Sequence, residues 1–314
     1  MLSQLPMVAM NTQLNPNSGG SSSLDEDTSA EVREIEILAR RLVKDTLAGQ
    51  YHAVFKGRGM SFDSVREYQA GDDVRTIDWN VSARTGGVFV KQYVEERELT
   101  VLVAVDLSAS LQFGTVDVNK RKMAARIAAV LALSAISNND RVGLVLFTDR
   151  IERYIPPKKG RAHVLRIVRE VLQFEPIGRQ TRLDLGLDYL ANIVRKRAVV
   201  FVLSDFMGQG YERSLAVTAR RHDLVPVVVT DPVERRFPQL NYLIPLEDFE
   251  TGDLLWFDAG DADGLQTYWQ RAAVDTRKRQ DLFRKHGLEA IDATLGQDYL
   301  PALAAYFRRR AARQ

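Results

Sequence analysis

Residues 99–106 read Leu-Thr-Val-Leu-Val-Ala-Val-Asp, and the chain continues as Leu107-Ser108-Ala109-Ser110. The nearly unbroken apolar run predicts a strand that is buried on both faces. Such a strand belongs in the middle of a parallel sheet that helices cover on both sides. The polar residues that follow it then fall at the carboxyl end of the strand, which is where ligands bind in sheets of this kind.

The rest of the C-terminal part of the chain repeats this alternation of apolar strands and amphipathic helices. We expect strands at 142–148, 151–155, 198–204, 224–230 and 288–293, and helices at 119–137, 161–173, 182–196, 212–221, 265–286 and 299–312. Residues 240–257 predict a hairpin with its turn at 250–253. The pattern indicates an α/β fold with a doubly wound, mostly parallel sheet of the Rossmann type.

We divide the chain into three segments. Residues 1–28, rich in Asn, Ser and Gly, predict a disordered tail. Residues 29–98 contain a helix expected at 31–47, with Ile35, Leu38, Leu42 and Val43 on its apolar face, and a small block with short β stretches expected at 53–55 and 88–94. That block is otherwise irregular and rich in Gly, Arg and Asp. Residues 99–314 form the sheet domain.

The composition excludes several kinds of chemistry. The 314 residues include no cysteine, which rules out disulfides and thiolate metal sites. The 43 basic and 41 acidic side chains nearly balance, so we expect no nucleic-acid partner. No run of about 18 apolar residues is present, so we expect no integral membrane segment and a cytoplasmic location. The four histidines lack the spacing of a metal site or a catalytic triad.

Three loops at the predicted strand ends carry oxygen ligands. Asp106, Ser108 and Ser110 follow the first strand, Thr181 precedes a helix, and Asp205 follows the strand at 198–204. Two carboxylates and three hydroxyls favour a hard cation such as Mg²⁺ or Mn²⁺. The alternative interpretation is that the Asp, Ser and Thr residues only cap helices. Capping does not explain Asp205, which stands at the end of a second strand.

The order Asp106-x-Ser108-x-Ser110, then Thr181, then Asp205 resembles the metal-ion-dependent adhesion site of von Willebrand factor A domains. The resemblance implies a fold like that of these domains. It also implies that the five residues bind Mg²⁺, and that a carboxylate of a partner protein completes the coordination. The loop before Thr181 departs from the usual Gly-Gly-Thr pattern, because it reads Gly178-Arg179-Gln180.

A second block carries a longer motif. Residues 57–84 contain Gly57-x-Gly59-x-x-Phe62, Arg66-x-Tyr68-x-x-Gly71-Asp72-Asp73-x-Arg75-x-Ile77-Asp78-Trp79 and Ala83-Arg84. This block resembles the signature of the bacterial "domain of unknown function 58" family, in which an A-type domain follows it. Members of that family accompany MoxR-type AAA+ ATPases and other A-domain proteins. The resemblance therefore implies an adaptor or chaperone-like partner of such an ATPase.

Two interpretations of this signature block remain open. It is either a docking surface for a partner or a salt-bridged plug whose Tyr68 and Trp79 anchor it on the sheet domain. The residues of the docking interpretation are Arg66, Tyr68, Asp72, Asp73, Arg75, Asp78, Trp79 and Arg84. Their mixed charges argue against a nucleic-acid surface.

We expect a non-enzymatic interaction module, and one enzymatic alternative stays open. In a haloacid-dehalogenase-like phosphohydrolase, Asp106 would be the nucleophile and Asp205 would help to hold Mg²⁺. Such enzymes need an acid–base Asp two residues after the nucleophile, where this chain has Ser108, and a phosphate-binding Lys that the sequence does not identify. Residues 231–234, Asp-Pro-Val-Glu, lie at the same rim and either extend the metal site or form a turn.

Overall fold

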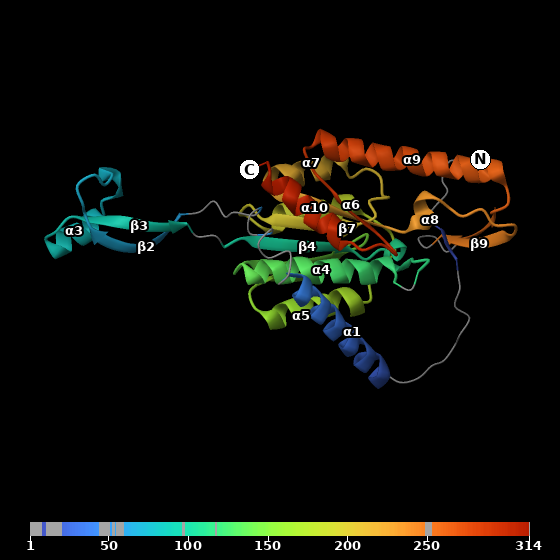
Figure 1. Cartoon of the computed structure of the whole chain (residues 1–314), viewed down its shortest axis with the longest axis horizontal. Coiled ribbons are helices and arrows are strands. Elements are labelled where there is room, and N and C mark those ends of the chain that lie inside the picture. Colours follow the sequence, from blue (N-terminus) through green and yellow to red (C-terminus); the bar gives the residue numbers. More distant parts are fainter. Residues whose placement is uncertain are drawn as a thin grey trace. The chain divides into compact units, whose positions relative to one another are not determined.

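The computed structural model describes residues 8–10, 21–43, 51, 54, 60–95, 98–116, 118–248 and 253–313. Its contacts divide the chain into two units, of which the larger comprises residues 1–54 and 100–314 and the smaller residues 55–99. The elements of both units are labelled in Figure 1. The two units are taken one at a time below.

The larger unit is built on a six-stranded sheet in the order β11-β8-β7-β4-β5-β6. Strand β4 lies in its interior and pairs in parallel with β5 and β7, whereas the edge strand β6 runs antiparallel to β5. The strands are β4 Thr100–Asp106, β5 Arg141–Phe147, β6 Ile151–Lys158, β7 Val199–Ser204, β8 Asp223–Thr230 and β11 Ile291–Thr294. The predicted α/β fold with a mostly parallel sheet is confirmed.

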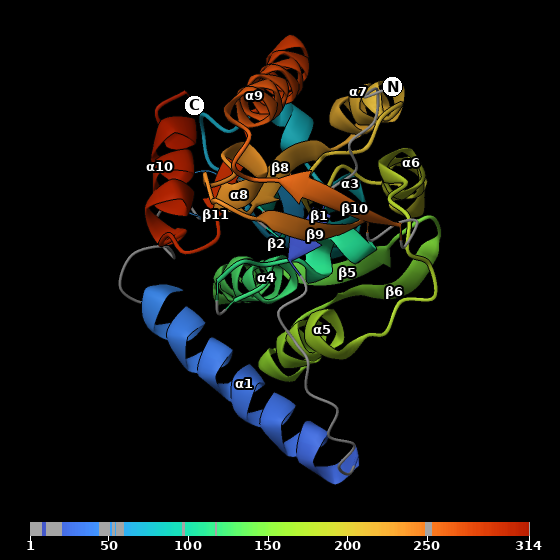
Figure 2. The ribbon, with the colours of Figure 1, turned by 90° about the vertical axis from the view of Figure 1, so that its right-hand side faces the viewer.

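Helices cover both faces of this sheet, and Figure 2 shows α4 and α5 on the opposite side from α6 and α7. Leu102 and Ala104 of β4 pack with Leu187 of α6, Leu215 of α7 and Phe283 of α9. The helices are α4 Lys120–Ser137, α5 Arg161–Gln173, α6 Leu183–Ile193, α7 Glu212–Arg221, α9 Ala262–Lys285 and α10 Leu300–Ala311. No helix in the described part of the chain is both long and apolar enough to cross a bilayer.

Helix α4 is buried on almost every side, because α1 (Ser21–Leu42) and α5 cover the surface that it turns away from the sheet. Val32, Ile35 and Ala39 recur at helical spacing and form the buried stripe of α1. The helix begins at Ser21 and not at residue 31, since no Gly or Pro interrupts residues 21–30 after Gly20. Part of the expected tail is therefore helical. Helix α1 also belongs to the sheet unit, although we had grouped it with the signature block.

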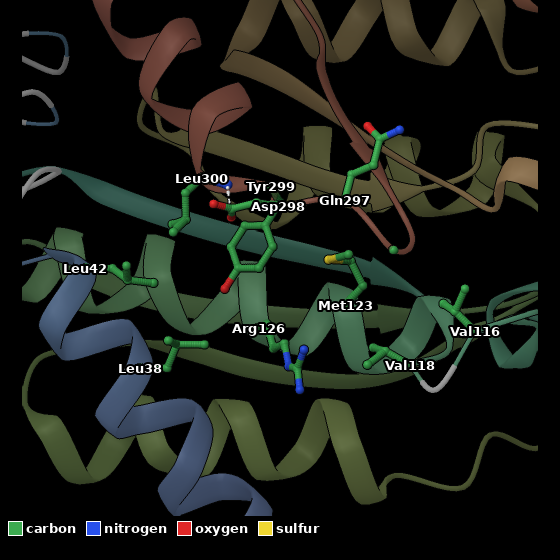
Figure 3. A pocket seen from close by; sticks show the side chains of 11 residues that line it. Leu38, Leu42, Val116, Val118, Met123, Arg126, Gln297, Asp298, Tyr299 and Leu300 are labelled. Atoms are coloured by element: carbon green, nitrogen blue, oxygen red, sulfur yellow. Dashed lines mark hydrogen bonds between the residues drawn. The ribbon is translucent and has the colours of Figure 1, made fainter.

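A pocket of about 470 Å³ opens where α1, α4 and the turn before α10 meet (Figure 3). Leu38, Met123 and Tyr299 supply much of its apolar lining, and Arg126 adds a guanidinium. Leu38 is 39% exposed, so this residue of the predicted apolar face lines an open pocket and is not in the core.

A second, three-stranded sheet contains β1 (Val8–Met10), β9 (Leu243–Asp248) and β10 (Leu254–Asp258). Strands β9 and β10 pair antiparallel, which confirms the predicted hairpin. Of the turn expected at 250–253, residues 250–252 lie outside the described residues. Strand β1 falls within the expected tail and pairs with β9. The hairpin follows the short helix α8 (Pro232–Arg235), which stands directly after β8.

The smaller unit is an antiparallel pair, β2 (Met60–Glu67) and β3 (Phe89–Glu95), with the short helices η2 (Val74–Thr76) and α3 (Trp79–Thr85) between the strands. Strand β3 confirms the β stretch expected at 88–94, whereas residues 53 and 55 lie outside the described part. The sequence did not predict β2 or α3. Helix α3 is too short to show a helical period, but Asp78 gives its start, because its Oδ1 accepts from the amides of Asn80 and Val81.

Candidate functional site

The first strand end folds into a tight loop around one carboxylate. Asp106 is fully buried, and its Oδ1 accepts a hydrogen bond of 2.9 Å from the amide of Ser108. The hydroxyls of Ser108 and Ser110 lie 3.0 Å apart, and both residues are buried. The structure thus brings the three residues of the predicted motif together within hydrogen-bonding distance at the end of β4.

The end of β7 approaches the same carboxylate. The hydroxyl of Ser204 donates to Oδ2 of Asp106 over 2.8 Å, which joins the two strand ends. The next residue but one, Phe206, has a positive φ of 53°, which is uncommon for a residue with a side chain. This backbone turn places the Phe206 ring in the core against Phe283 and leaves Asp205 at the strand end. Local strain of this kind is common at functional sites.

A lysine that the sequence did not identify lies beside Asp205. Nζ of Lys120, in the first turn of α4, donates to Oδ2 of Asp205 over 3.1 Å and also contacts Glu234. The Lys120 side chain is 0% exposed and that of Asp205 is 1% exposed. The remaining oxygen of Asp205 accepts from the amide of Met207 (3.1 Å), and its carbonyl accepts from the buried Arg279 (3.0 Å).

The segment after β8 supplies Glu234. Asp231 caps helix α8 in a capping box with Glu234, whose Oε2 accepts from the Asp231 amide (3.0 Å). Asp231 also accepts from the amide and the hydroxyl of Thr115, in the loop between β4 and α4. Residues 231–234 therefore form a turn, and Glu234 of that turn contacts Lys120 beside Asp205.

Thr181 is half-buried and lies in a loop that touches two of the other loops. The carbonyl of Arg179 accepts from the amide of Ala109 over 3.0 Å. On its other side, Cγ2 of Thr181 would lie 3.6 Å from a Cβ added to Gly208, three residues after Asp205. The loop that carries Thr181 therefore contacts the loops after β4 and β7, and the other four predicted ligands in those two loops are buried.

The buried charges at this end of the sheet do not balance. Four buried carboxylates, those of Asp106, Asp205, Asp231 and Glu234, stand near the ammonium of Lys120 and the guanidinium of Arg279. Burial and then the charge of Asp205 raise the pKa of Asp106 to about 7. Burial likewise raises the pKa of Glu234 to about 7, against the opposing effect of Lys120. Burial alone would lower the pKa of Lys120, but Asp205 and Glu234 raise it above its ordinary value.

This arrangement fits a hard divalent cation. The candidate ligands offer only oxygen. Burial, and then the charge of Asp205, raise the pKa of Asp106, and a cation would stabilise its charged form. Among the described residues, however, no cluster of three or more His, Asp or Glu side chains has the geometry of a metal site. A cation would therefore depend on the hydroxyls of Ser108, Ser110 and Thr181 as well as on carboxylates. One of these carboxylates, that of Asp205, also accepts from Lys120.

The signature block is ordered by its own ion pairs. Arg66 and Asp72 form a bidentate pair with both N–O distances at 2.7 Å, which lowers the pKa of Asp72. Lys91 pairs with Asp78 over 3.9 Å, and Asp73 caps η2. Five of the eight predicted docking residues are exposed, whereas Arg66, Asp72 and Asp78 are partly buried. Among the described residues the most exposed aromatic is Trp79, at 69%.

Comparison with known proteins gives one family. The family model described as "Protein of unknown function DUF58" matches residues 64–279. The uncharacterized protein Rv1480 of Mycobacterium tuberculosis is 30% identical over 296 residues, which cover 92% of each chain. The uncharacterized protein MAV169 of Mycobacterium avium is 24% identical over 159 residues, which cover 50% of this chain and 93% of that protein.

Solved structures with a similar fold share little sequence. The conserved hypothetical protein BatB from Bacteroides thetaiotaomicron is 13% identical, with a TM-score of 0.41, and covers 69% of this chain and 100% of that one. The SpRpn10 VWA domain is 8% identical, with a TM-score of 0.36, over 66% of this chain and 94% of that one. A von Willebrand factor type A protein from Catenulispora acidiphila is 13% identical, with a TM-score of 0.34, over 71% of this chain and 43% of that one.

Proposed function

Since this chain belongs to the DUF58 family, we propose that it is a protein-interaction module that binds an acidic side chain of its partner through a divalent cation at the strand ends. One observation carries the proposal. Asp106, Ser108 and Ser110 are joined by hydrogen bonds at the end of β4, and Asp205 stands at the end of the neighbouring strand. Among the described residues there, buried carboxylates outnumber the cations beside them.

In this proposal Asp106, Ser108, Ser110, Thr181 and Asp205 hold Mg²⁺ or Mn²⁺. The cation would supply a positive charge to which a carboxylate oxygen of the partner can coordinate. The chain's own residues position it: Ser204 orients Asp106 by its hydrogen bond, and the amide of Met207 orients Asp205. Because these orienting groups are buried or part-buried, the ligands are held in place before any cation binds.

The rim of the site suits a partner protein. Ile177 and Met207 are 77% and 43% exposed, and each lies in a loop that contributes a candidate ligand. Val116, in the loop that follows the Asp-x-Ser-x-Ser motif, is 41% exposed. Exposed apolar side chains around a polar centre are typical of surfaces that bind other proteins. Arg179, exposed beside Ser108, adds a positive charge for an acidic partner.

The partner in this proposal is a MoxR-type AAA+ ATPase, and other A-domain proteins are further candidates. The support is the signature block of the family, which this chain carries in full at residues 57–84. The block is a separate unit with its own ion pairs. It therefore offers a second surface on which such an ATPase could recognise the chain.

The test is a pull-down of the cognate ATPase by the full chain, in Mg²⁺ and in EDTA. We expect binding in Mg²⁺, loss of binding in EDTA, and loss in Asp106→Ala and Asp205→Ala. Asp184→Ala is the matched control, because Asp184 is a partly exposed carboxylate of the same sheet unit that pairs with Arg182. Binding that ignores both EDTA and the two site variants would refute the cation bridge.

One observation favours the enzymatic alternative. Lys120 stands beside Asp205, where a phosphohydrolase of the haloacid dehalogenase type would need a lysine. Against it, Ser108 occupies the position of the acid–base Asp, and both oxygens of Asp106 accept hydrogen bonds from the protein. Turnover of p-nitrophenyl phosphate that disappears in Asp106→Asn would favour this alternative over the interaction module.

A further inference from the structure

We infer that Lys120 is a built-in competitor of the metal: its ammonium bridges Asp205 and Glu234, and it must release Asp205 and keep Glu234 when Asp205 binds the cation. This inference concerns the regulation of the proposed site and rests on the proposed function. Three features of the structure carry it: the position of the ammonium, the second acceptor beside it, and the lack of an exit to solvent.

The position of the ammonium is set by packing. Lys120 is the first residue of α4, and its amide donates to the carbonyl of Phe113 over 3.0 Å. Its side chain is 0% exposed, and Nζ lies 5.8 Å from the centre of the Phe113 ring. The ammonium can therefore not move into water, as a surface lysine would.

Both oxygens of Asp205 already accept hydrogen bonds from the protein. Its Oδ2 accepts from Lys120 (3.1 Å) and its Oδ1 accepts from the Met207 amide (3.1 Å). A metal ion beside Asp205 would meet the Lys120 ammonium as a like charge at short range, within a buried site where screening is weak. A divalent cation therefore binds Asp205 directly only if the ammonium moves away from it.

Glu234 is a second carboxylate that can hold the ammonium once it leaves Asp205. Nζ of Lys120 already contacts Glu234, whose side chain is only 9% exposed. Glu234 is fixed by the capping box of α8, and Asp231 of that box is bonded to Thr115 in the loop between β4 and α4. A shift of Lys120 toward Glu234 would thus displace α8 and the loop that follows the candidate ligands. Lys120 would link the occupancy of the site to the position of its rim.

The test measures cation binding to the full chain by isothermal titration calorimetry with Mg²⁺ and by electron paramagnetic resonance with Mn²⁺. Lys120→Met keeps the length of the side chain and removes its charge. Glu234→Gln keeps the shape and removes the second acceptor. We expect Lys120→Met to bind Mg²⁺ at least tenfold more tightly than the wild type, and Glu234→Gln to bind it at least threefold more weakly.

The opposite signs of the two expected changes in Mg²⁺ affinity distinguish competition by Lys120 from a structural role. Both variants break the same ion pair, so loss of a structural contact would change the affinity in the same direction. Lys122→Met is the control for net charge: Lys122 lies in the same turn of α4 but pairs with Glu31 of α1. Its Mg²⁺ affinity should stay within twofold of the wild type.

A double variant keeps the inference testable if Lys120→Met does not fold. Lys120→Met leaves two carboxylates without their cation and is the variant most exposed to unfolding. Lys120→Met/Glu234→Gln removes the pair together and should fold, with a Mg²⁺ affinity above that of Glu234→Gln.

Each pattern of Mg²⁺ affinities supports or overturns the competition by Lys120, the proposed metal site, or both. Equal affinities in the wild type and Lys120→Met, or tighter binding by Glu234→Gln, would overturn the competition by Lys120 and leave the proposed metal site standing. Binding by Lys120→Met but not by the wild type would support the competition and overturn the proposed use of a metal by the native chain. No binding by the wild type, Lys120→Met or the double variant would overturn both.

Discussion

The ammonium of Lys120 and the carboxylate of Asp205 lie 3.1 Å apart, 85 residues apart in the sequence and both shielded from solvent. This contact joins the first turn of α4 to the end of β7, in the middle of the candidate site. A buried ion pair is a demanding arrangement, because either charge becomes costly when its partner is removed. The pair therefore affects stability as well as any metal site.

The first prediction concerns this pair. Asp205→Asn removes one of the negative charges beside the buried ammonium and leaves that of Glu234 in contact with it. We expect the free energy of unfolding in EDTA to fall by about 3 kcal/mol. Urea denaturation of the full chain measures it. The control is Asp184→Asn, which breaks an ion pair with the exposed Arg182 and should cost less than about 1 kcal/mol. Equal losses of unfolding free energy in the two variants would show that the buried pair stabilises the fold no more than the exposed pair does.

The second prediction concerns the loop that carries Thr181. The amide of Gly178 donates to Glu152 over 2.7 Å, and a Cβ on Gly178 would overlap Thr148 and Asp149. Gly178→Ala must shift this loop, so we expect it to cost about 1–3 kcal/mol of stability and to weaken Mg²⁺ binding.

The control for the loop is Gly208→Ala. An added Cβ at Gly208 meets no atom closer than 3.5 Å, so this variant should match the wild type in thermal unfolding and in Mg²⁺ titration. If Gly178→Ala bound Mg²⁺ as the wild type does, Thr181 would be excluded as a ligand, because its loop could move without effect.

The sheet could be predicted from the sequence, because continuous apolar runs followed by polar residues indicate buried parallel strands and their carboxyl ends. That rule placed Asp106 and Asp205 at one edge before the structure was known. Lys120 could not be predicted in this way, since a lysine at the start of a helix is usually solvated. Its burial arises only when the loop at 113–119, β7 and α8 meet around it.

The helices show the same division between local and tertiary causes. The sequence placed the start of α1 at a capping pattern near residue 31, yet the helix begins at Ser21, because nothing in residues 21–30 breaks it. Residues 231–234 gave a turn signal that was correct for the backbone. The signal did not reveal that Glu234, held by that turn, faces Lys120.

The third prediction is a pH dependence. His222 is 1% exposed, its Nδ1 accepts from the Ala198 amide (3.3 Å), and burial lowers its pKa below the ordinary 6.5. The folded state therefore resists protonation of this ring more than the unfolded state does. Its contribution to stability is present above about pH 6.5 and is lost as the pH falls through the lowered pKa.

We expect the free energy of unfolding to fall between pH 7.5 and pH 5.5, and His222→Gln to reduce the size of that fall. Urea denaturation at the two pH values measures it. His286→Gln, at the end of α9, is the control for the loss of a histidine. A slope that is the same in the wild type and His222→Gln would contradict the prediction.

The last prediction distinguishes the two interpretations of the signature block. Trp79, the first residue of α3, is 69% exposed. If it docks a partner, Trp79→Ala should change the free energy of unfolding by less than about 0.5 kcal/mol and weaken capture of the ATPase at least tenfold, because exposed aromatics are frequent binding hot spots. If Trp79 anchors a structural plug, the variant should instead lower the stability of the full chain and leave capture of the ATPase proportional to the folded fraction. Thermal unfolding and a pull-down on the same samples distinguish the two interpretations.

Val74→Ala is the control for a general loss of apolar surface, because Val74 is another exposed apolar residue of the smaller unit. Equal effects of Trp79→Ala and Val74→Ala on capture of the ATPase would refute a specific role for Trp79.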